Sequence, residues 1–153
     1  MKIKKNSCLL AAIIFIGFCL RLYHLGDLSL WLDELHTVVT TSGSIYSTIY
    51  SFQHAPFPAL YFILINLWAK IFGISEFSLR FPSLLFSTLS IFVAYKLGKE
   101  FFDRRVGMIA AFLLAVSPYS VNYAQEARPY ALTWLLGLSS FYILLVKTRW
   151  PDF

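Results

Sequence analysis

Long apolar runs, separated by short charged segments, constrain this chain more than any other feature of its sequence. The runs cover residues 8–25, 57–72, 81–97, 106–124 and 131–146. A helix needs about 20 predominantly apolar residues to cross the hydrocarbon core of a bilayer. Only 14% of the residues are charged and the mean hydropathy is +0.66, whereas about 25% of a soluble domain is charged. The pattern predicts an all-α integral membrane protein.

The basic residues argue against a nucleic-acid partner, although the net charge is +5. They lie in short clusters beside the apolar runs, which is the pattern that orients helices in a membrane. Because no small-x-small cleavage site follows the first run, we expect a retained transmembrane helix rather than a signal peptide. Cys8 and Cys19 lie inside that run, where cysteine behaves as a small hydrophobic residue.

The segment 57–72 decides the topology, because it is apolar but short and contains Lys70. At 1.5 Å per residue it reaches about 24 Å, less than the roughly 30 Å core. If it does not cross, nine of the thirteen basic residues lie on the cytoplasmic side, and if it crosses, only six do. The positive-inside rule therefore favours a segment that stays outside.

This topology has about four transmembrane helices and one long outer segment. The transmembrane helices are predicted at residues 1–25, 80–98, 106–124 and 131–147. Residues 26–79 form the outer segment, which carries interfacial amphipathic helices. Together they make a single truncated transmembrane domain over 1–153. We expect a multi-pass protein of the cell membrane, with a bacterial inner membrane as its location.

Two adjacent carboxylates, Asp33 and Glu34, follow the first apolar run. An N-cap at Ser29 and a stop at 41–43 predict one short helix between them. Its predicted polar face is made by Asp33, His36, Thr37 and Thr40, and its apolar face by Leu32, Leu35, Val38 and Val39. We therefore expect an amphipathic helix that lies on the membrane with its acids toward water.

The preferred topology places several ionisable side chains on the outer face: Asp33, Glu34, His54, Glu126 and Arg128. An arginine fork can bind phosphate oxygens, and a carboxylate can accept the proton of an attacking hydroxyl. These residues could therefore hold an activated phosphate ester. Structural alternatives remain for each: the acids can solvate an exposed helix, His54 can cap a turn, and Arg128 can pair with Glu126.

Arg21 lies near the outer end of the first predicted helix. A guanidinium that faces lipid would cost several kcal/mol, whereas one near a helix end can reach the interface. We therefore expect Arg21 to face the protein interior or the headgroups rather than the acyl chains.

Four motifs, in order, carry a resemblance to a known family. They are Trp-Leu-Asp-Glu at 31–34, His-Ala-Pro-Phe-Pro-Ala-Leu-Tyr at 54–61, Phe-Gly-Ile-Ser-Glu-Phe-Ser-Leu-Arg-Phe-Pro-Ser at 72–83, and Tyr-Ala-Gln-Glu-Ala-Arg-Pro-Tyr-Ala-Leu at 123–132. From about residue 20 to 145 the chain resembles the N-terminal part of membrane glycosyltransferases of the GT-C type. More narrowly, it is similar to the family 39 group related to protein O-mannosyltransferases and lipid A aminoarabinose transferases.

The resemblance implies transfer of a sugar from a polyprenyl-phosphate carrier to an acceptor on the outer side of the cytoplasmic membrane. Asp33 matches the family's acid in the first outer loop, which implies a role as general base or another essential role. Glu34 matches its neighbour in the same Asp-Glu motif, so both acids are candidate catalytic residues. His54 and Arg128 match positions where the family places polar residues around the carrier phosphate. Glu126 and Arg21 are further candidates for substrate binding.

The expected partners are the lipid-linked sugar donor and membrane lipids, with no nucleic acid. The sequence shows no Cys or His spacing of a metal site, although Asp33 and Glu34 could share a divalent ion with a phosphate. Because members of the family usually have several hundred residues, we expect a missing C-terminal half or a partner chain. The alternative function is that of a non-catalytic membrane protein of the same fold, which binds a lipid phosphate or a partner protein.

Overall fold

The computed structural model describes residues 2–51 and 59–149, and in these two ranges all regular secondary structure is helical. The helices are α1 (Lys2–Leu22), α2 (Leu32–Thr41), α3 (Ile45–Ser51), α4 (Ala59–Phe72), α5 (Glu76–Phe101), α6 (Arg104–Val116), α7 (Pro118–Ala124) and α8 (Tyr130–Arg149). The prediction of an all-α chain is confirmed for the described residues.

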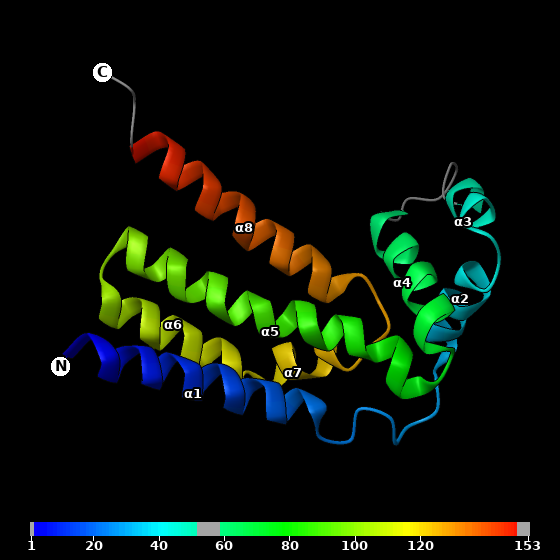
Figure 1. Cartoon of the computed structure of the whole chain (residues 1–153), viewed down its shortest axis with the longest axis horizontal. Helices are drawn as coiled ribbons and strands as arrows, with labels where there is room; N and C mark the ends of the chain where they lie inside the picture. The colour runs from blue at the N-terminus through cyan, green and yellow to red at the C-terminus, as the bar shows by residue number, and fades with distance from the viewer. Residues whose placement is uncertain (1, 52–58, 150–153) are drawn as a thin grey trace.

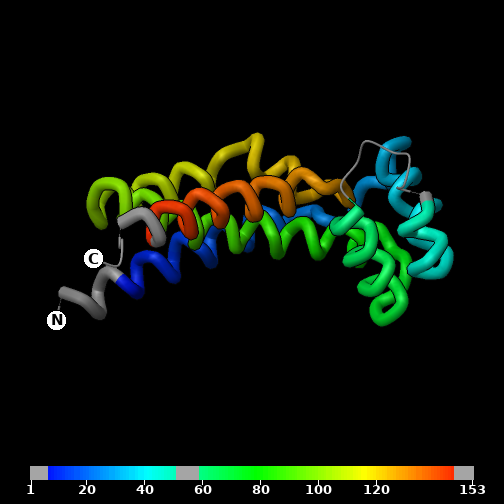
Figure 2. The backbone as a smooth tube through the Cα atoms, turned by 90° about the horizontal axis from the view of Figure 1, so that it is seen from above, coloured from blue at the N-terminus to red at the C-terminus, as the bar shows by residue number. Residues whose placement is uncertain are grey.

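The long helices α1, α5, α6 and α8 lie side by side and form the body of the molecule (Figure 1). Helix α5 lies at the centre, since it contacts α1, α6 and α8. The start of α1 and the end of α8 lie at one end of this bundle, and α2, α3 and α4 gather at the other, as a second view also shows (Figure 2). The turn between α7 and α8, which carries Glu126 and Arg128, faces the same end as α2.

Capping residues fix where the central helices begin. Ser75 precedes α5, and its hydroxyl oxygen accepts a hydrogen bond from the Ser78 amide at 3.1 Å. Asp103 precedes α6, and its carboxylate accepts from the amides of Arg105 and Val106 at 2.7 and 2.8 Å. Both caps satisfy N–H groups that have no partner inside the helix.

Glycines allow α5 and α6 to pack backbone against backbone. A Cβ atom on Gly98 would lie 2.8 Å from Gly107 Cα, and one on Gly107 would lie 2.5 Å from the Tyr95 carbonyl oxygen. Such close approach between small residues is typical of helix pairs in membranes. The short turn between α5 and α6 therefore joins two tightly packed helices.

By length and composition, α5 is the one described helix that could cross a membrane by itself. Helices α6 and α7 would add a second span only as a pair, because they meet at a bend of 58°. The segments Ser7–Leu22, Ala59–Phe72 and Tyr130–Val146 are apolar but shorter. Four transmembrane helices are thus not confirmed, and the span predicted at 106–124 is bent rather than straight.

Helix α2 buries a different face from the predicted one. It begins at Leu32, after Trp31 rather than Ser29 as N-cap. Glu34 and Thr37 are fully buried, whereas Leu32 is 79% exposed. The inner face carries Glu34 and Thr37 because Arg80 and the Ala127 backbone bind them, whereas His36 of the predicted polar face is exposed. The leucine and valine side chains of the outer face suit a membrane surface. The prediction that both acids face water is wrong for Glu34, and only Asp33 keeps a partly exposed side chain.

A buried amide on α4 bonds to α2, to α3 and to the turn between them. The Asn66 Nδ2 group donates to the carbonyl oxygens of Thr41 and Gly43 at 2.7 and 2.9 Å, and to Thr48 Oγ1 at 3.2 Å. These acceptors lie at the end of α2, in the following turn and in α3. Helices α2, α3 and α4 therefore pack together as one unit.

Candidate functional site

A buried ion pair between α2 and α5 forms the structural centre of this end of the molecule. Arg80 Nε donates to Glu34 Oε1 at 2.9 Å, and Arg80 Nη2 donates to Glu34 Oε2 at 2.7 Å. The Arg80 side chain is 6% exposed and the Glu34 side chain 0%. Parallel N–H···O bonds of this kind are the strongest geometry for an arginine and a carboxylate.

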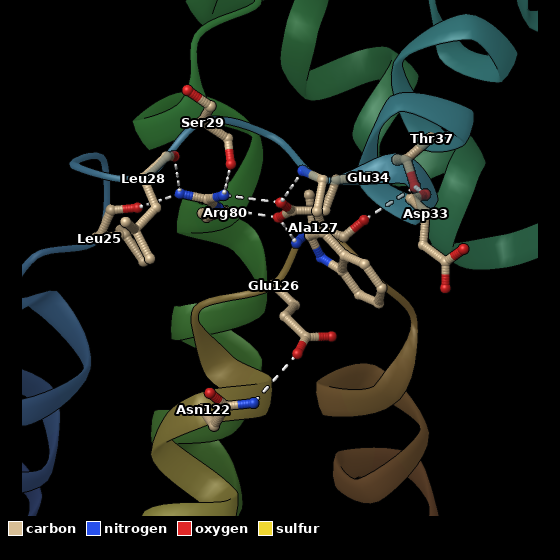
Figure 3. Close-up of polar contacts among 11 residues, drawn as sticks. Leu25, Leu28, Ser29, Asp33, Glu34, Thr37, Arg80, Asn122, Glu126 and Ala127 are labelled. Carbon is tan, nitrogen blue, oxygen red and sulfur yellow. Dashed lines mark hydrogen bonds and ion pairs between the residues drawn. The ribbon is translucent and has the colours of Figure 1, made fainter.

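The remaining hydrogen-bonding groups of Arg80 bind the connection between α1 and α2. Arg80 Nη1 donates to the carbonyl oxygens of Leu25 and Leu28 at 3.1 and 2.8 Å, and Nη2 donates to that of Ser29 at 3.3 Å. Figure 3 shows the guanidinium between these carbonyls and the Glu34 carboxylate. Arg80 therefore fixes the path of the chain into α2.

Glu34 also binds the connection between α7 and α8. Its Oε1 accepts from the Ala127 amide at 2.8 Å, and its Oε2 accepts from the Trp31 amide at 3.3 Å. Thr37 Oγ1 adds a bond to the Ala127 carbonyl oxygen at 2.9 Å. Burial by itself would raise the pKa of Glu34, but the hydrogen bonds from Arg80 and Ala127 outweigh it and lower that pKa. Glu34 is therefore a charged structural link rather than an open carboxylate.

Asp33 and Arg128 lie together on the other side of α2. Arg128 Nη1 donates to the Asp33 carbonyl oxygen at 3.2 Å, and Arg128 Nη2 lies 3.7 Å from Asp33 Oδ2. Figure 3 shows the Asp33 carboxylate pointing away from Arg80 and Glu34. The two residues line a hollow of about 460 Å³ with the side chains of Leu32, Leu35, His36 and Val39.

This hollow combines one carboxylate and one guanidinium with an apolar rim. The Asp33 side chain is 44% exposed, so its carboxylate can reach a molecule in the hollow. Arg128 is 8% exposed, and a guanidinium shielded from water binds an anion more strongly than an exposed one. The surrounding leucine and valine side chains suit the hydrocarbon part of a lipid. The arrangement fits a phosphate attached to an apolar chain.

Glu126 lies near these residues but outside the hollow lining. Its Oε1 accepts from Asn122 Nδ2 at 3.2 Å, and Figure 3 shows its carboxylate turned toward α7. Burial, followed by the negative charge of Glu34, raises the pKa of Glu126. The structure thus brings Asp33, Glu34, Glu126 and Arg128 to one end of the bundle, as the topology predicts.

Arg21 is buried inside the helix bundle, with 0% of its surface exposed. The prediction that it avoids the acyl chains is confirmed. Its guanidinium N–H groups donate hydrogen bonds to neutral oxygens of the protein, including Ser87 Oγ at 2.8 Å and Ser120 Oγ at 2.7 Å. A direct contact with substrate does not fit a side chain enclosed in this way.

His54 lies outside the described residues, so its predicted place at the carrier phosphate stays a prediction. Within residues 2–51 and 59–149, no group of three or more His, Cys, Asp or Glu side chains is placed to hold a metal ion. A divalent ion shared by Asp33 and Glu34 does not fit the geometry, because the Glu34 carboxylate is bound by Arg80 and Ala127.

The sequence reasoning assigned no role to Arg80. The sequence does contain a signal for this residue, since Arg80 lies at the edge of an apolar run and belongs to one of the four motifs. A charge that enters such a run needs a partner, but the sequence does not show which carboxylate supplies it. The backbone of Ala127, which binds both Glu34 and Thr37, could not be identified from side-chain chemistry.

Comparison with known proteins identifies one family. The sequence model of the dolichyl-phosphate-mannose-protein mannosyltransferase family matches residues 53–153, about two thirds of the chain. The matched part includes α5 to α8 and therefore Arg80, Glu126 and Arg128, whereas Asp33, Glu34 and Arg21 precede it. No curated protein and no solved structure gives a significant match.

Proposed function

The chain belongs to the dolichyl-phosphate-mannose-protein mannosyltransferase family, and from this premise we propose that it forms the N-terminal part of a membrane glycosyltransferase that takes its sugar from a polyprenyl-phosphate carrier. The acceptor is a hydroxyl group at the outer membrane surface. The main support is the hollow in which Asp33 and Arg128 lie beside apolar side chains of α2.

In the proposed reaction, the acceptor hydroxyl oxygen attacks the anomeric carbon of the sugar while the bond from that carbon to the carrier phosphate breaks. Asp33 accepts the hydroxyl proton as general base. Negative charge develops on the phosphate oxygens, and Arg128 stabilises it by hydrogen bonds and charge. The separation of 3.7 Å between Arg128 Nη2 and Asp33 Oδ2 means that a phosphate would compete with Asp33 for the guanidinium and leave the carboxylate available to the acceptor.

Arg128→Ala is expected to weaken binding of polyprenyl phosphate about tenfold or more, because charge-assisted hydrogen bonds contribute about 1.5–3 kcal/mol. Arg128→Lys keeps the charge but loses the fork, so it should recover only part of the affinity. Arg105→Ala serves as a matched control, since Arg105 is exposed at the opposite end of the bundle. Binding to liposome-reconstituted protein measures the effect. An Arg128→Ala affinity equal to that of wild type would remove Arg128 from the carrier site.

The proposed topology has four crossings, made by α1, α5, the bent pair α6 and α7, and α8, with residues 26–79 outside. In a chain with Cys8→Ala and Cys19→Ala, we expect an impermeant thiol reagent added from outside to label Ile74→Cys. The same reagent should not label Phe102→Cys, although both side chains are exposed in the protein, at 54% and 75%. They lie at opposite ends of α5. Labelling of Phe102→Cys without Ile74→Cys would reverse the topology.

A further inference from the structure

The guanidinium of Arg21 meets α6 at the point where that helix is interrupted. Arg21 Nη2 donates to the Leu114 carbonyl oxygen at 3.0 Å, and Arg21 Nη1 donates to the Ala115 carbonyl oxygen at 3.0 Å. Two residues later, Ser117 leaves the helical conformation with φ −62° and ψ 119°. Helix α7 then continues in a direction 58° away from α6.

Pro118 explains why the Leu114 carbonyl group needs a donor from elsewhere. In an α-helix the carbonyl oxygen of residue i accepts from the N–H of residue i+4, and for Leu114 that residue is Pro118, which has no N–H. An unpaired carbonyl buried in an apolar bundle is costly. The Arg21 side chain supplies the missing donor from a different helix, and so the bend is held without an unsatisfied group.

Arg21 also fixes the start of α7, and a neighbouring contact fixes its end. Arg21 Nη2 donates to Ser120 Oγ at 2.7 Å, and Arg21 Nε donates to Ser87 Oγ at 2.8 Å. At the other end of α7, Gln125 Nε2 donates to the carbonyl oxygens of Arg21 and Tyr23 at 3.1 and 2.6 Å. The short helix is therefore attached to α1 at both ends.

The chain passes directly from α7 into the turn that carries Arg128. Ala127 in that turn binds Glu34 through its amide, and Arg128 reaches Asp33. The direction of α7 consequently determines where this turn meets α2. All five Arg21 bonds go to neutral oxygens on four helices, since Gly17 O accepts the fifth at 2.8 Å. Among natural side chains, arginine offers the most donors in a fixed planar arrangement.

We propose that Arg21 is a positioning residue for the carrier site. Its guanidinium replaces the backbone donor that Pro118 lacks, holds the bend between α6 and α7, and thereby places Arg128 beside Asp33. The effect of Arg21 on carrier binding rests on the proposed function, whereas its effect on the angle between α6 and α7 does not.

The bend is tested by the distance between spin labels on Val106 and Asn122, in a chain with Cys8→Ala and Cys19→Ala. A straight helix would separate these positions by about 24 Å, and the bend shortens the distance. Arg21→Met has a similar length but no donors, so we expect a longer or broader distance distribution. Arg21→Lys should retain part of the bend. Lys99→Met, which removes an exposed charge at the opposite end of the bundle, should change nothing.

Binding of polyprenyl phosphate to the unlabelled variants tests the site. Arg21→Met should weaken it at least tenfold. Pro118→Ala in the Arg21→Met chain restores an N–H for the Leu114 carbonyl, so we expect thermal stability to recover. The spin-label distance should stay altered, and binding of polyprenyl phosphate should stay weak. Recovery of affinity together with stability would mean that Arg21 is only structural and would overturn the proposal.

Two further results would also contradict the proposal: an unchanged label distance in Arg21→Met, or a changed distance with unchanged affinity.

Should Arg21→Met fail to insert into the membrane, Ser120→Ala removes one contact of Arg21 and should shift the label distance in the same direction by less. A wild-type chain that binds no polyprenyl phosphate would contradict the proposed function and the role of Arg21 in the site. The label distance would still test its control of the bend.

Discussion

Replacing Glu34 with alanine is expected to destabilise the protein by about 3–5 kcal/mol, because it leaves the buried guanidinium of Arg80 without its counter-charge. The substitution also removes the acceptor of the Ala127 amide, so the turn between α7 and α8 loses its bond to α2. The free energy of unfolding, measured by detergent titration of the helical signal, reports the loss. Such a value would rank among the largest effects of single substitutions.

Two comparisons separate the charge of Glu34 from its shape. Glu34→Gln keeps a carbonyl oxygen for Ala127 but loses the charge, so we expect a smaller but clear loss of stability. Glu76→Gln changes the same chemical group at the first turn of α5, where a carboxylate contributes about 0.3–1 kcal/mol through the helix dipole. A Glu34→Ala effect no larger than that of Glu76→Gln would show that the ion pair does not hold this end together.

The lowered pKa of Glu34 gives the same link a pH dependence. A carboxyl group whose pKa is lower in the folded than in the unfolded state stabilises the fold fully above its unfolded pKa. This contribution is lost as the pH falls from there through the lowered pKa. Wild-type protein should therefore lose stability toward acid more steeply than Glu34→Gln, which carries no titrating group at this position.

Helix positions were readable from the sequence because they depend on local pattern. The apolar runs and the caps at Ser75 and Asp103 are short-range signals, and α5 and α6 begin close to the predicted limits. The break before Pro118 also has a signal in the sequence, since Ser followed by Pro is typical of a helix start. The prediction of one apolar span over 106–124 overlooked that signal. Local rules therefore predicted the elements better than their directions.

The local sequence pattern did not predict which face of α2 packs against the rest of the protein. Periodicity separates polar from apolar positions but does not say which set meets the rest of the chain, because in a membrane protein the apolar face can be the outer one. The outcome depends on Arg80, which lies 46 residues from Glu34 along the chain. The same distant contact assigns different roles to two adjacent acids: Glu34 turns inward to Arg80, and Asp33 turns to the hollow.

Asp33→Asn is expected to lower sugar transfer by about 10²–10⁴-fold, the range that general-base catalysis usually contributes. The amide cannot accept the proton of the acceptor hydroxyl. The protein should still fold, because the Asp33 side chain is partly exposed and its carbonyl oxygen, which binds Arg128, is unchanged. Carrier binding should not weaken, because the phosphate and the Asp33 carboxylate compete for the Arg128 guanidinium. The loss should therefore appear in kcat rather than in the affinity for polyprenyl phosphate.

The measurement is transfer from a labelled polyprenyl-phosphate sugar by purified protein in liposomes. Asp27→Asn is the matched control, because Asp27 is an exposed acid on the connection before α2 that pairs with His24. Near-normal transfer by Asp33→Asn would exclude Asp33 as the base. Glu34 is a poor substitute, since its carboxylate is buried and bound by Arg80. That result would make Glu126 the next candidate base at this end of the bundle. Carrier binding without any transfer by the wild-type chain would instead favour the non-catalytic alternative, in which the hollow holds a lipid phosphate and Asp33 serves only to orient Arg128.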